Sequence, residues 1–316
     1  MKLPSVRDKG ILAASASAFF LGLSPIFGKQ AILFGFSPFF VVAFRTTIAC
    51  LLLLCFILIF KRQFLYIHPL GLVGCFVAGL INGIGSVFYY SSLARLDAGI
   101  GQLLYSFYPL FLVFWLFLDR QSVSKITIVR LVLVLPGIFL LLHTTDEKVD
   151  LLGAGFMLLA AVFYSLHILV NQRVLYEVPS PTVTFYTLVA MSVTVCIAFL
   201  FMDPHLPTSN LSWYPLIILA IITFLSRITL FMGVKHLGGM QTALLGLGEL
   251  IVTVVVAQFY LGEHLTLIQW IGALFICLSL ILVIIDKPPT IKRKGKGFLY
   301  WLNPPAINPT DTPFQN

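Results

Sequence analysis

Long apolar segments alternate with short polar connections along most of this chain. A helix that crosses a bilayer needs about 20 predominantly apolar residues. By this measure we count ten candidate spanning segments: 11–32, 39–60, 70–94, 99–118, 126–142, 151–171, 182–202, 211–232, 240–260 and 267–285. The pattern predicts an all-α membrane protein with ten transmembrane helices, and the short connections leave no room for a soluble domain of any size.

Composition supports the membrane interpretation, and the distribution of charge orients the chain. Of the 316 residues, 59% are hydrophobic and 10% are charged, whereas a soluble domain carries about 25% charged residues. The net charge of +8 is compatible with binding to a nucleic acid. With a cytoplasmic N-terminus, however, the ten spans place most Lys and Arg residues on the cytoplasmic side, as the positive-inside rule requires. We therefore expect a multi-pass protein of the cell membrane with both termini cytoplasmic and no nucleic-acid partner; a homodimer stays open.

The two ends of the chain are expected to stay outside the bilayer. Residues 1–10 form a short basic segment before the first span. Lys29 lies near the end of that span and a second span follows directly, so we expect a retained helix and not a cleaved signal peptide. Residues 286–316 form a basic, disordered cytoplasmic tail. The tail either contacts anionic headgroups, anchored by Phe298, Tyr300 and Trp301, or only solubilises the protein. All five cysteines lie within spans, where we expect them to pack and not to form disulfides or a metal site.

A weak internal repeat divides the spans into two sets of five. A shift of 143 residues places Gly10 on Gly153, Ser37-Pro38 on Ser180-Pro181 and Lys29-Gln30 on Gln172-Arg173, and a shift of 141 places Leu96 on Leu237. The repeats are 11–142 and 151–285, joined by the polar loop HTTDEKVD. Because five is odd, the second repeat enters the membrane from the opposite side. This predicts two inverted five-helix repeats, an organisation that in transporters places the substrate site near the midplane.

The segment GMQTALLGLGELIVTVVVAQFYLGEHLTLIQWIGALFICLSLIL resembles the second repeat of the EamA family in the drug/metabolite transporter superfamily. The motifs that carry the resemblance are Glu249-Leu250, Leu261-Gly262-Glu263 and a Gln-x-x-Gly at Gln269 and Gly272. The first half supplies Tyr108-Pro109, but Arg120-Gln121-Ser122 stands in the Leu-Gly-Glu position, and Leu250 replaces a frequent proline. The resemblance covers residues 11–285 and implies a secondary transporter of small metabolites.

Polar residues recur on one face of several spans, at the three- and four-residue spacing of helix neighbours. One stripe is Thr242, Gly246, Glu249, Thr253 and Tyr260, and another is Cys75, Gly79, Asn82, Ser86 and Tyr89. The shift of 141 places Asn82 on Thr223, Ser86 on Arg227 and Tyr108 on Glu249. We infer that the third, fourth, eighth and ninth spans line a central cavity. Helix packing is the alternative: it is favoured for the glycines of Gly79-x-x-x-Gly83, and it is as good as a ligand role for Asn82.

Glu249 is the carboxylate that lies deepest in a predicted span. A carboxylate at the bilayer centre costs roughly 2.5–3.5 kcal/mol on insertion scales. At a rise of 1.5 Å per residue, Glu249 lies roughly 13 Å deep and Arg227, on the preceding span, roughly 7–8 Å deep. We expect the two side chains to form an ion pair. Glu249 is then either a structural partner of Arg227 or a proton-binding residue that couples transport to the proton gradient, since a buried acid without a partner favours its neutral form.

The other polar groups within the spans have simpler expected roles. Arg130 lies near a helix end, from which its side chain can reach the interface. His167 is favoured as a hydrogen-bonded structural residue, because no second metal ligand follows at a suitable spacing. Arg45 either bonds loop carbonyls or contacts substrate.

The sequence-based hypothesis is a secondary transporter, an exporter or exchanger, that works by alternating access. No nucleotide-binding or catalytic motif is found, so we expect no cofactor, no metal and no enzymatic activity. An intramembrane enzyme or lipid-handling protein is the alternative. Arg45 and Arg227 would favour a small-molecule substrate such as an amino acid or another organic anion or zwitterion. The substrate-binding candidates are Arg45, Asn82, Ser86, Tyr89, Tyr105, Tyr108, Thr223, Arg227, Thr242 and Glu249.

Overall fold

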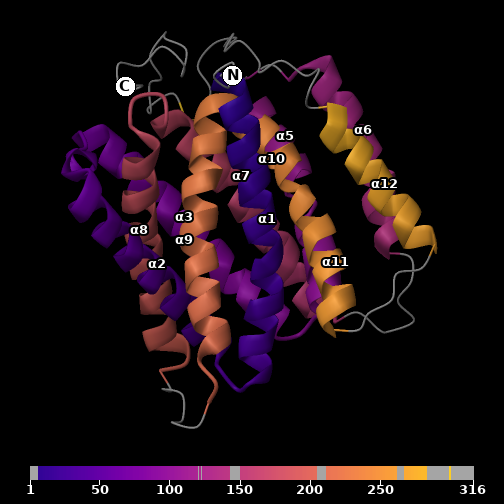
Figure 1. The fold of residues 1–316 in the computed structure, drawn as a ribbon, viewed down its shortest axis with the longest axis horizontal. Helices are drawn as coiled ribbons and strands as arrows, with labels where there is room; N and C mark the ends of the chain where they lie inside the picture. The colour runs from indigo at the N-terminus through magenta and orange to yellow at the C-terminus, as the bar shows by residue number, and fades with distance from the viewer. Residues whose placement is uncertain are drawn as a thin grey trace.

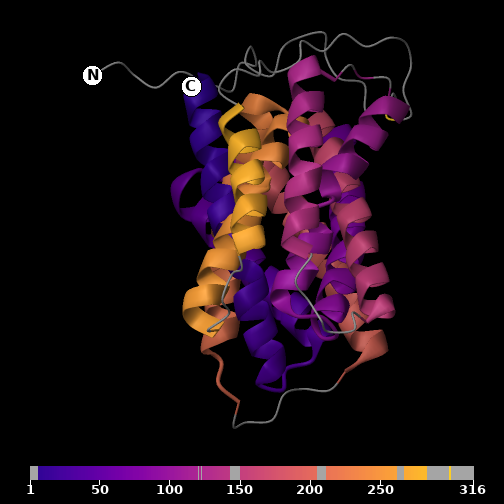
Figure 2. The same cartoon turned by 90° about the vertical axis from the view of Figure 1, so that its right-hand side faces the viewer.

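In the computed structural model, all secondary structure within the described residues is helical. These residues are 6–119, 121, 123–142, 150–204, 211–261, 267–282 and 299. The helices are α1 (Val6–Leu33), α2 (Pro38–Phe60), η1 (Arg62–Leu65), α3 (Pro69–Leu93), α4 (Ala98–Tyr105), α5 (Tyr108–Leu118), α6 (Lys125–Leu142), α7 (Leu151–Val174), α8 (Ser180–Met202), α9 (Tyr214–Leu237), α10 (Gly239–Gly246), α11 (Gly248–Leu261) and α12 (Leu267–Ile281). The long helices stand side by side in one bundle (Figures 1 and 2).

Eight helical stretches are long and apolar enough to cross a membrane. Six are single helices (α1, α2, α3, α7, α8 and α9), and the other two combine α4 with α5 and α10 with most of α11. This establishes an integral membrane protein of many spans. The helices α6 and α12 pack against each other at one edge of the bundle (Figure 1). Their crossing of the membrane, and therefore the total of ten, stays a prediction, and the predicted tail lies outside the described residues apart from Leu299.

Several helices begin where the sequence carries a start signal. The equivalent pairs Ser37-Pro38 and Ser180-Pro181 both open helices, with proline in the first turn of α2 and α8. Proline suits this turn because its missing N–H would have no partner within the helix. Asp150 caps α7 by accepting hydrogen bonds from the backbone N–H groups of Leu152 and Gly153. The bond from Gly153, together with the Arg95 side chain, holds the pKa of Asp150 below its ordinary value.

The segments 99–118 and 240–260 were each expected to be one continuous helix, and the structure interrupts both. One helix breaks at Ser106 and Phe107, between α4 and α5, and the other breaks at Leu247, between α10 and α11. In the first, Pro109 removes a backbone donor and favours a new helix start. In the second, glycines flank the break on both sides. The two interruptions are equivalent under the shift of 141 residues.

The two halves of the chain interleave. Helix α1 packs on α9, and its equivalent α7 packs on α3. Likewise, α1 contacts α11 as α7 contacts α5, and α2 contacts α9 as α8 contacts α3. The glycines of the repeat occupy matched positions: a Cβ on Gly10 would lie 2.8 Å from Leu237, and one on Gly153 would lie 3.0 Å from Leu96. Each missing side chain therefore lets a helix start approach the end of a helix from the other half.

These contacts also give the directions of α1 and α7. The start of α1 lies beside the end of α9, because Gly10 approaches Leu237. The end of α1 lies beside the end of α3, because Lys29 bonds the Leu93 carbonyl oxygen, and the start of α7 is there too, beside Leu96. Helix α7 thus begins where α1 finishes. We call the end where α1 begins the near end, uppermost in Figure 1, and the opposite one the far end.

A Gly79→Ala substitution is expected to destabilise the bundle. A Cβ at this position would lie 2.5 Å from both Ala190 Cβ and the Thr187 carbonyl oxygen of α8. Because a backbone atom cannot move aside, we expect a loss of about 1–3 kcal/mol, measured as a lower melting temperature in detergent. Gly155→Ala is the matched control, since a Cβ there meets nothing within 4 Å. Equal melting temperatures for the two variants would contradict this prediction.

Candidate functional site

A polar pocket lies inside the bundle, between residues of seven helices. The space not filled by atoms there, open solvent included, is about 490 Å³. Its lining residues are Leu21, Ser24, Arg45, Asn82, Gly85, Ser86, Tyr89, Tyr90, Gln102, Tyr105, Ala160, Tyr164, Arg227 and Glu249. The sequence pattern indicated α3, α4, α9 and α11 as lining helices, and the structure adds α1, α2 and α7.

Seven of the ten candidate residues line this pocket, and Tyr108, Thr223 and Thr242 do not. Thr223 lies behind Arg45 and accepts a hydrogen bond from its Nη1 atom at 3.3 Å. The Tyr108 hydroxyl donates to the Ala243 carbonyl oxygen at 2.7 Å, which fastens α5 to α10 beside the pocket. Thr242 is buried, with its methyl group toward Gly233 of α9. These three residues support the walls.

Two guanidinium groups, from the neighbouring helices α2 and α9, reach the pocket. Arg45 of α2 contacts Ser86 at 3.5 Å and lies 4.6 Å from the centre of the Tyr90 ring. The Arg227 guanidinium of α9 faces Asn82 of α3. With the Asn82 amide oxygen turned toward it, the orientation that satisfies both groups, Nη1 and Nη2 donate at 3.2 and 3.1 Å. Both arginines are almost fully buried, so their charges are shielded from bulk water and available to a ligand in the pocket.

Glu249 lies in the first turn of α11 with 2% of its surface exposed. The Gln102 side chain hydrogen-bonds its carboxyl group, and Gln102 Oε1 accepts a bond from the Tyr89 hydroxyl at 3.1 Å. The other Glu249 oxygen, Oε1, is buried without a hydrogen-bond partner in the structure. Glu249 is thus held by a neutral amide, and part of its bonding capacity is left for a proton or a ligand.

The predicted ion pair between Arg227 and Glu249 is absent from the described structure. Both side chains line the pocket, but the ion pairs within 4.0 Å among the described residues join other partners. The reason is local: the Arg227 guanidinium is turned toward Asn82, and Gln102 occupies the position beside the carboxyl group. The prediction of a direct pair was therefore wrong for this conformation, although both groups share one cavity.

Tyrosine rings form one wall of the pocket. The ring centres of Tyr89 and Tyr105 lie 5.0 Å apart, and those of Tyr105 and Tyr164 lie 5.3 Å apart. Tyr108 packs edge-on against Tyr164 behind them, at 5.0 Å. Such rings offer apolar faces and can also stabilise a cation.

Tyr164 and Gln102 were not among the candidate residues. Tyr164 lies on a polar stripe of α7 with His167 and Asn171, a signal that could have identified it. Gln102 gave a weaker signal, because the shift of 141 places it on the apolar Ala243.

The expectation that Arg130 reaches the membrane interface was wrong. Its side chain is fully buried: Nε donates to the Ser279 carbonyl oxygen of α12 at 3.0 Å, and Nη1 bonds Gln241 of α10. It ties α6 to the second repeat. His167 has the expected structural environment, with Nδ1 3.0 Å from the Ala78 carbonyl oxygen and the Asn171 amide beside it.

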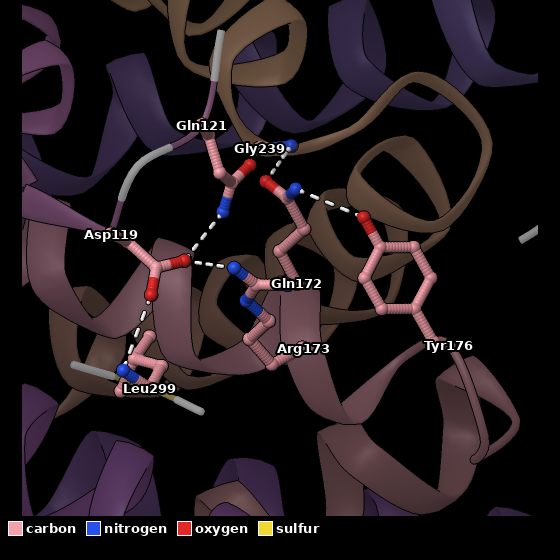
Figure 3. Close-up of polar contacts among 7 residues, drawn as sticks. All are labelled: Asp119, Gln121, Gln172, Arg173, Tyr176, Gly239 and Leu299. Carbon is pink, nitrogen blue, oxygen red and sulfur yellow. Dashed lines mark hydrogen bonds and ion pairs between the residues drawn. The ribbon is translucent and has the colours of Figure 1, made fainter. Parts of the chain in front are cut away.

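A second buried charge cluster lies at the near end, outside the pocket (Figure 3). The Arg173 guanidinium of α7 pairs with Asp119, at the end of α5, and both side chains are fully buried. The same carboxylate accepts hydrogen bonds from Gln121 Nε2 at 2.9 Å and from the Leu299 backbone N–H at 3.2 Å. Asp119 lies just outside the predicted span, which explains why it was not recognised as buried.

The pocket is suited to binding a small molecule that carries charge. It offers two guanidinium groups, one carboxyl group, hydroxyls and aromatic faces. Among the described residues, no three His, Cys, Asp or Glu side chains are grouped as a metal site would require. The arrangement can hold an anionic group at the arginines, a cationic group at Glu249 and the tyrosines, or both together.

Comparisons with known proteins identify a family and two relatives that are named as transporters. The model of the EamA-like transporter family matches twice, over residues 8–143 and 151–285. The chain is 26% identical over 239 residues to "Uncharacterized transporter sll1319" of Synechocystis, which covers 71% of this chain and 70% of that protein. It is 24% identical over 208 residues to "Uncharacterized transporter YcbK" of Bacillus subtilis, which covers 62% of this chain and 64% of YcbK. A crystal structure superposes with a TM-score of 0.71 over 88% of this chain and 97% of its own, at 16% identity, and shows the same fold.

Proposed function

Because the chain belongs to the EamA-like transporter family, we propose that this membrane transporter moves a small organic anion or zwitterion, such as an amino acid, by alternating access. The protein acts as an exporter or exchanger, without enzymatic activity. The observation that carries the proposal is the charge of the pocket: among the described lining residues, two arginines, Arg45 and Arg227, face one carboxyl group, that of Glu249. A substrate carboxylate or phosphate compensates the excess positive charge.

The organisation of the chain supports alternating access. The family model matches two segments of nearly equal length, equivalent helices make equivalent contacts, and α7 begins at the end where α1 finishes. We propose ten membrane crossings arranged as two inverted repeats, in the cell membrane and with both ends cytoplasmic. Broken helices at the pocket fit this scheme, since transporters build midplane sites from discontinuous helices.

An uptake assay with an arginine variant tests the proposal. Purified protein in liposomes is expected to exchange labelled amino acids or other small organic anions across the membrane in a saturable manner. Arg227→Met is expected to lower exchange by at least about tenfold, the equivalent of about 1.4 kcal/mol for a lost charge-assisted contact. The substrate is also expected to raise the melting temperature of the wild-type protein, since a ligand that binds the folded state stabilises it.

Arg62→Met is the matched control, because Arg62 is exposed and its side chain bonds the carbonyl oxygen of Leu58, near the end of the preceding helix α2. It removes one positive charge without touching the pocket, so its exchange rate should equal that of the wild type. Uptake restricted to organic cations, or equal losses in the Arg227 and Arg62 variants, would refute the proposed substrate class.

A further inference from the structure

Two side chains at equivalent positions of the repeat reach across the pocket-lining helices at opposite ends of the molecule. Lys29 and Gln172 are related by the shift of 143 residues, and both lie near the ends of their helices, α1 and α7. Lys29 Nζ donates to the carbonyl oxygens of Leu93 at 3.0 Å and Leu96 at 2.9 Å, in the turn between α3 and α4. Gln172 Oε1 accepts from the backbone N–H of Gly239, the first residue of α10, at 2.8 Å (Figure 3).

The two contacts lie between two groups of helices that pack more closely within each group than across it. We define the first group as α1, α9 and α11, and the second group as α3, α5 and α7, from their mutual packing. Lys29 extends from the first group to the end of α3 in the second. Gln172 extends from the second group to the start of α10, which directly follows α9 of the first. The two contacts thus bridge the same two groups, one contact at each end.

The pocket lies between these groups. Ser24, Arg227 and Glu249 come from the first group, and Asn82 and Tyr164 come from the second. A pocket between two bodies opens toward one end when the bodies separate there. Separation at the far end breaks the contacts of Lys29, and separation at the near end breaks the contact of Gln172. The moving bodies defined in this way mix helices from both repeats and differ from the two sequence halves.

Neighbouring residues hold the near-end contact of Gln172 in place. Arg173, the residue after Gln172, pairs with the buried Asp119, which holds the end of α7 against α5. Gln172 Nε2 also contacts the Tyr176 hydroxyl at 3.3 Å, which orients the amide (Figure 3). A Cβ on Gly239 would lie 2.6 Å from Gln172 Oε1. Glycine at this position therefore permits the close approach of the amide to the backbone.

We propose that Lys29 and Gln172 are paired latches, Lys29 closing the far end of the transport pathway and Gln172 the near end. This rests on the proposed alternating access. The latches differ in chemistry: an ammonium group bonds two carbonyl oxygens at the far end, and a neutral amide bonds one N–H at the near end. Bonds to charged groups contribute more than neutral ones. The far-end latch is therefore the stronger.

A labelling experiment that needs no substrate tests the latches. The five cysteines are replaced, Ser24→Cys supplies a reporter in the pocket wall, and a membrane-impermeant maleimide is applied to either face of sealed vesicles. Lys29→Met is expected to raise labelling from the far end by about tenfold, as the loss of charge-assisted bonds implies. Gln172→Met is expected to raise labelling from the near end by about threefold, for the loss of one neutral bond.

Matched controls are the exposed residues Arg62 and Gln63 of η1, replaced by methionine. Both are expected to leave labelling at either face unchanged. Lys29→Arg keeps the hydrogen-bond donors and should label like the wild type. Tyr176→Phe removes the secondary contact of Gln172 and should have a smaller effect on labelling than Gln172→Met.

The direction of the change decides the proposal. The latches are supported if Lys29→Met raises labelling from the far end and Gln172→Met raises labelling from the near end. Equal changes at both faces, or unchanged labelling with a lower melting temperature, would show that Lys29 and Gln172 are structural ties only, and would overturn it. A chain that transports nothing would fail in the liposome assay, whereas the labelling result depends only on which end opens. Failure of the proposed function is thus distinguishable from failure of the latches.

Discussion

Transport by a Glu249→Gln variant is expected to be independent of pH between mildly acidic and mildly alkaline conditions, whereas transport by the wild type is expected to vary over the same range. Glu249 is 2% exposed, its nearest bonding partner is the neutral Gln102, and its Oε1 atom is buried without a partner. A carboxylate in such a position is costly as an anion. The group can become neutral by binding a proton, or it can be compensated by a cationic group of the substrate.

Glutamine keeps the shape of the side chain and can still bond Gln102, but it cannot bind a proton at this position. We therefore expect the melting temperature of the variant to equal that of the wild type, because no direct ion pair is lost. The measurement is the initial rate of exchange in liposomes at a series of pH values. Wild-type pH dependence in the variant would exclude Glu249 as the proton-binding residue. A large fall in stability would restore the structural-partner hypothesis.

Replacing Arg173 with methionine is expected to destabilise the protein by about 3–5 kcal/mol, the usual cost of removing one partner from a buried ion pair. Arg173 and Asp119 are both fully buried. Without the guanidinium, the carboxylate keeps, among the described residues, the neutral donors Gln121 and the Leu299 N–H. The measurement is the melting temperature or denaturant midpoint of the purified variant in detergent.

The double variant Asp119→Leu with Arg173→Met separates charge from packing. Removing both charges leaves no buried carboxylate without compensation, so most of the lost stability should return. Arg95→Met is the surface control: Arg95 pairs with Asp150 at 3.2 Å, but both side chains are more than one-third exposed. Such pairs contribute about 0–1 kcal/mol. An Arg173 variant as stable as the Arg95 variant would contradict the prediction.

Much of the fold could be predicted from the sequence because the bilayer requires long apolar helices. The spacing of apolar segments located the long helices, and Ser37-Pro38 and Ser180-Pro181 marked equivalent starts. The shift between the repeats matched residues that make equivalent contacts, including Gly10 and Gly153. The helix breaks at Ser106 and Leu247 were missed, since an apolar run has the same composition whether it is continuous or interrupted.

The positions of the pocket residues could be predicted better than their partners. Helical spacing placed Asn82, Ser86, Arg227 and Glu249 on faces that the structure brings to one cavity. Depth along a helix suggested that Arg227 would meet Glu249, but depth does not fix the direction of a long side chain. The partner of each residue depends on helices distant in sequence, as Gln102 shows.

The interleaving of the halves has a consequence for how the protein is made. Ser17 of α1 donates to the Ser226 carbonyl oxygen of α9, 209 residues later. The carbonyl oxygen of Gly22 accepts from Thr253 of α11, 231 residues later. When α1 leaves the ribosome, neither partner has been synthesised. The first helix must therefore wait in the bilayer, with its polar face incompletely packed, until translation of almost the whole chain is finished. Contacts of such sequence separation form slowly, so the docking of the first helix onto α9 and α11 is a late step in the biogenesis of this protein.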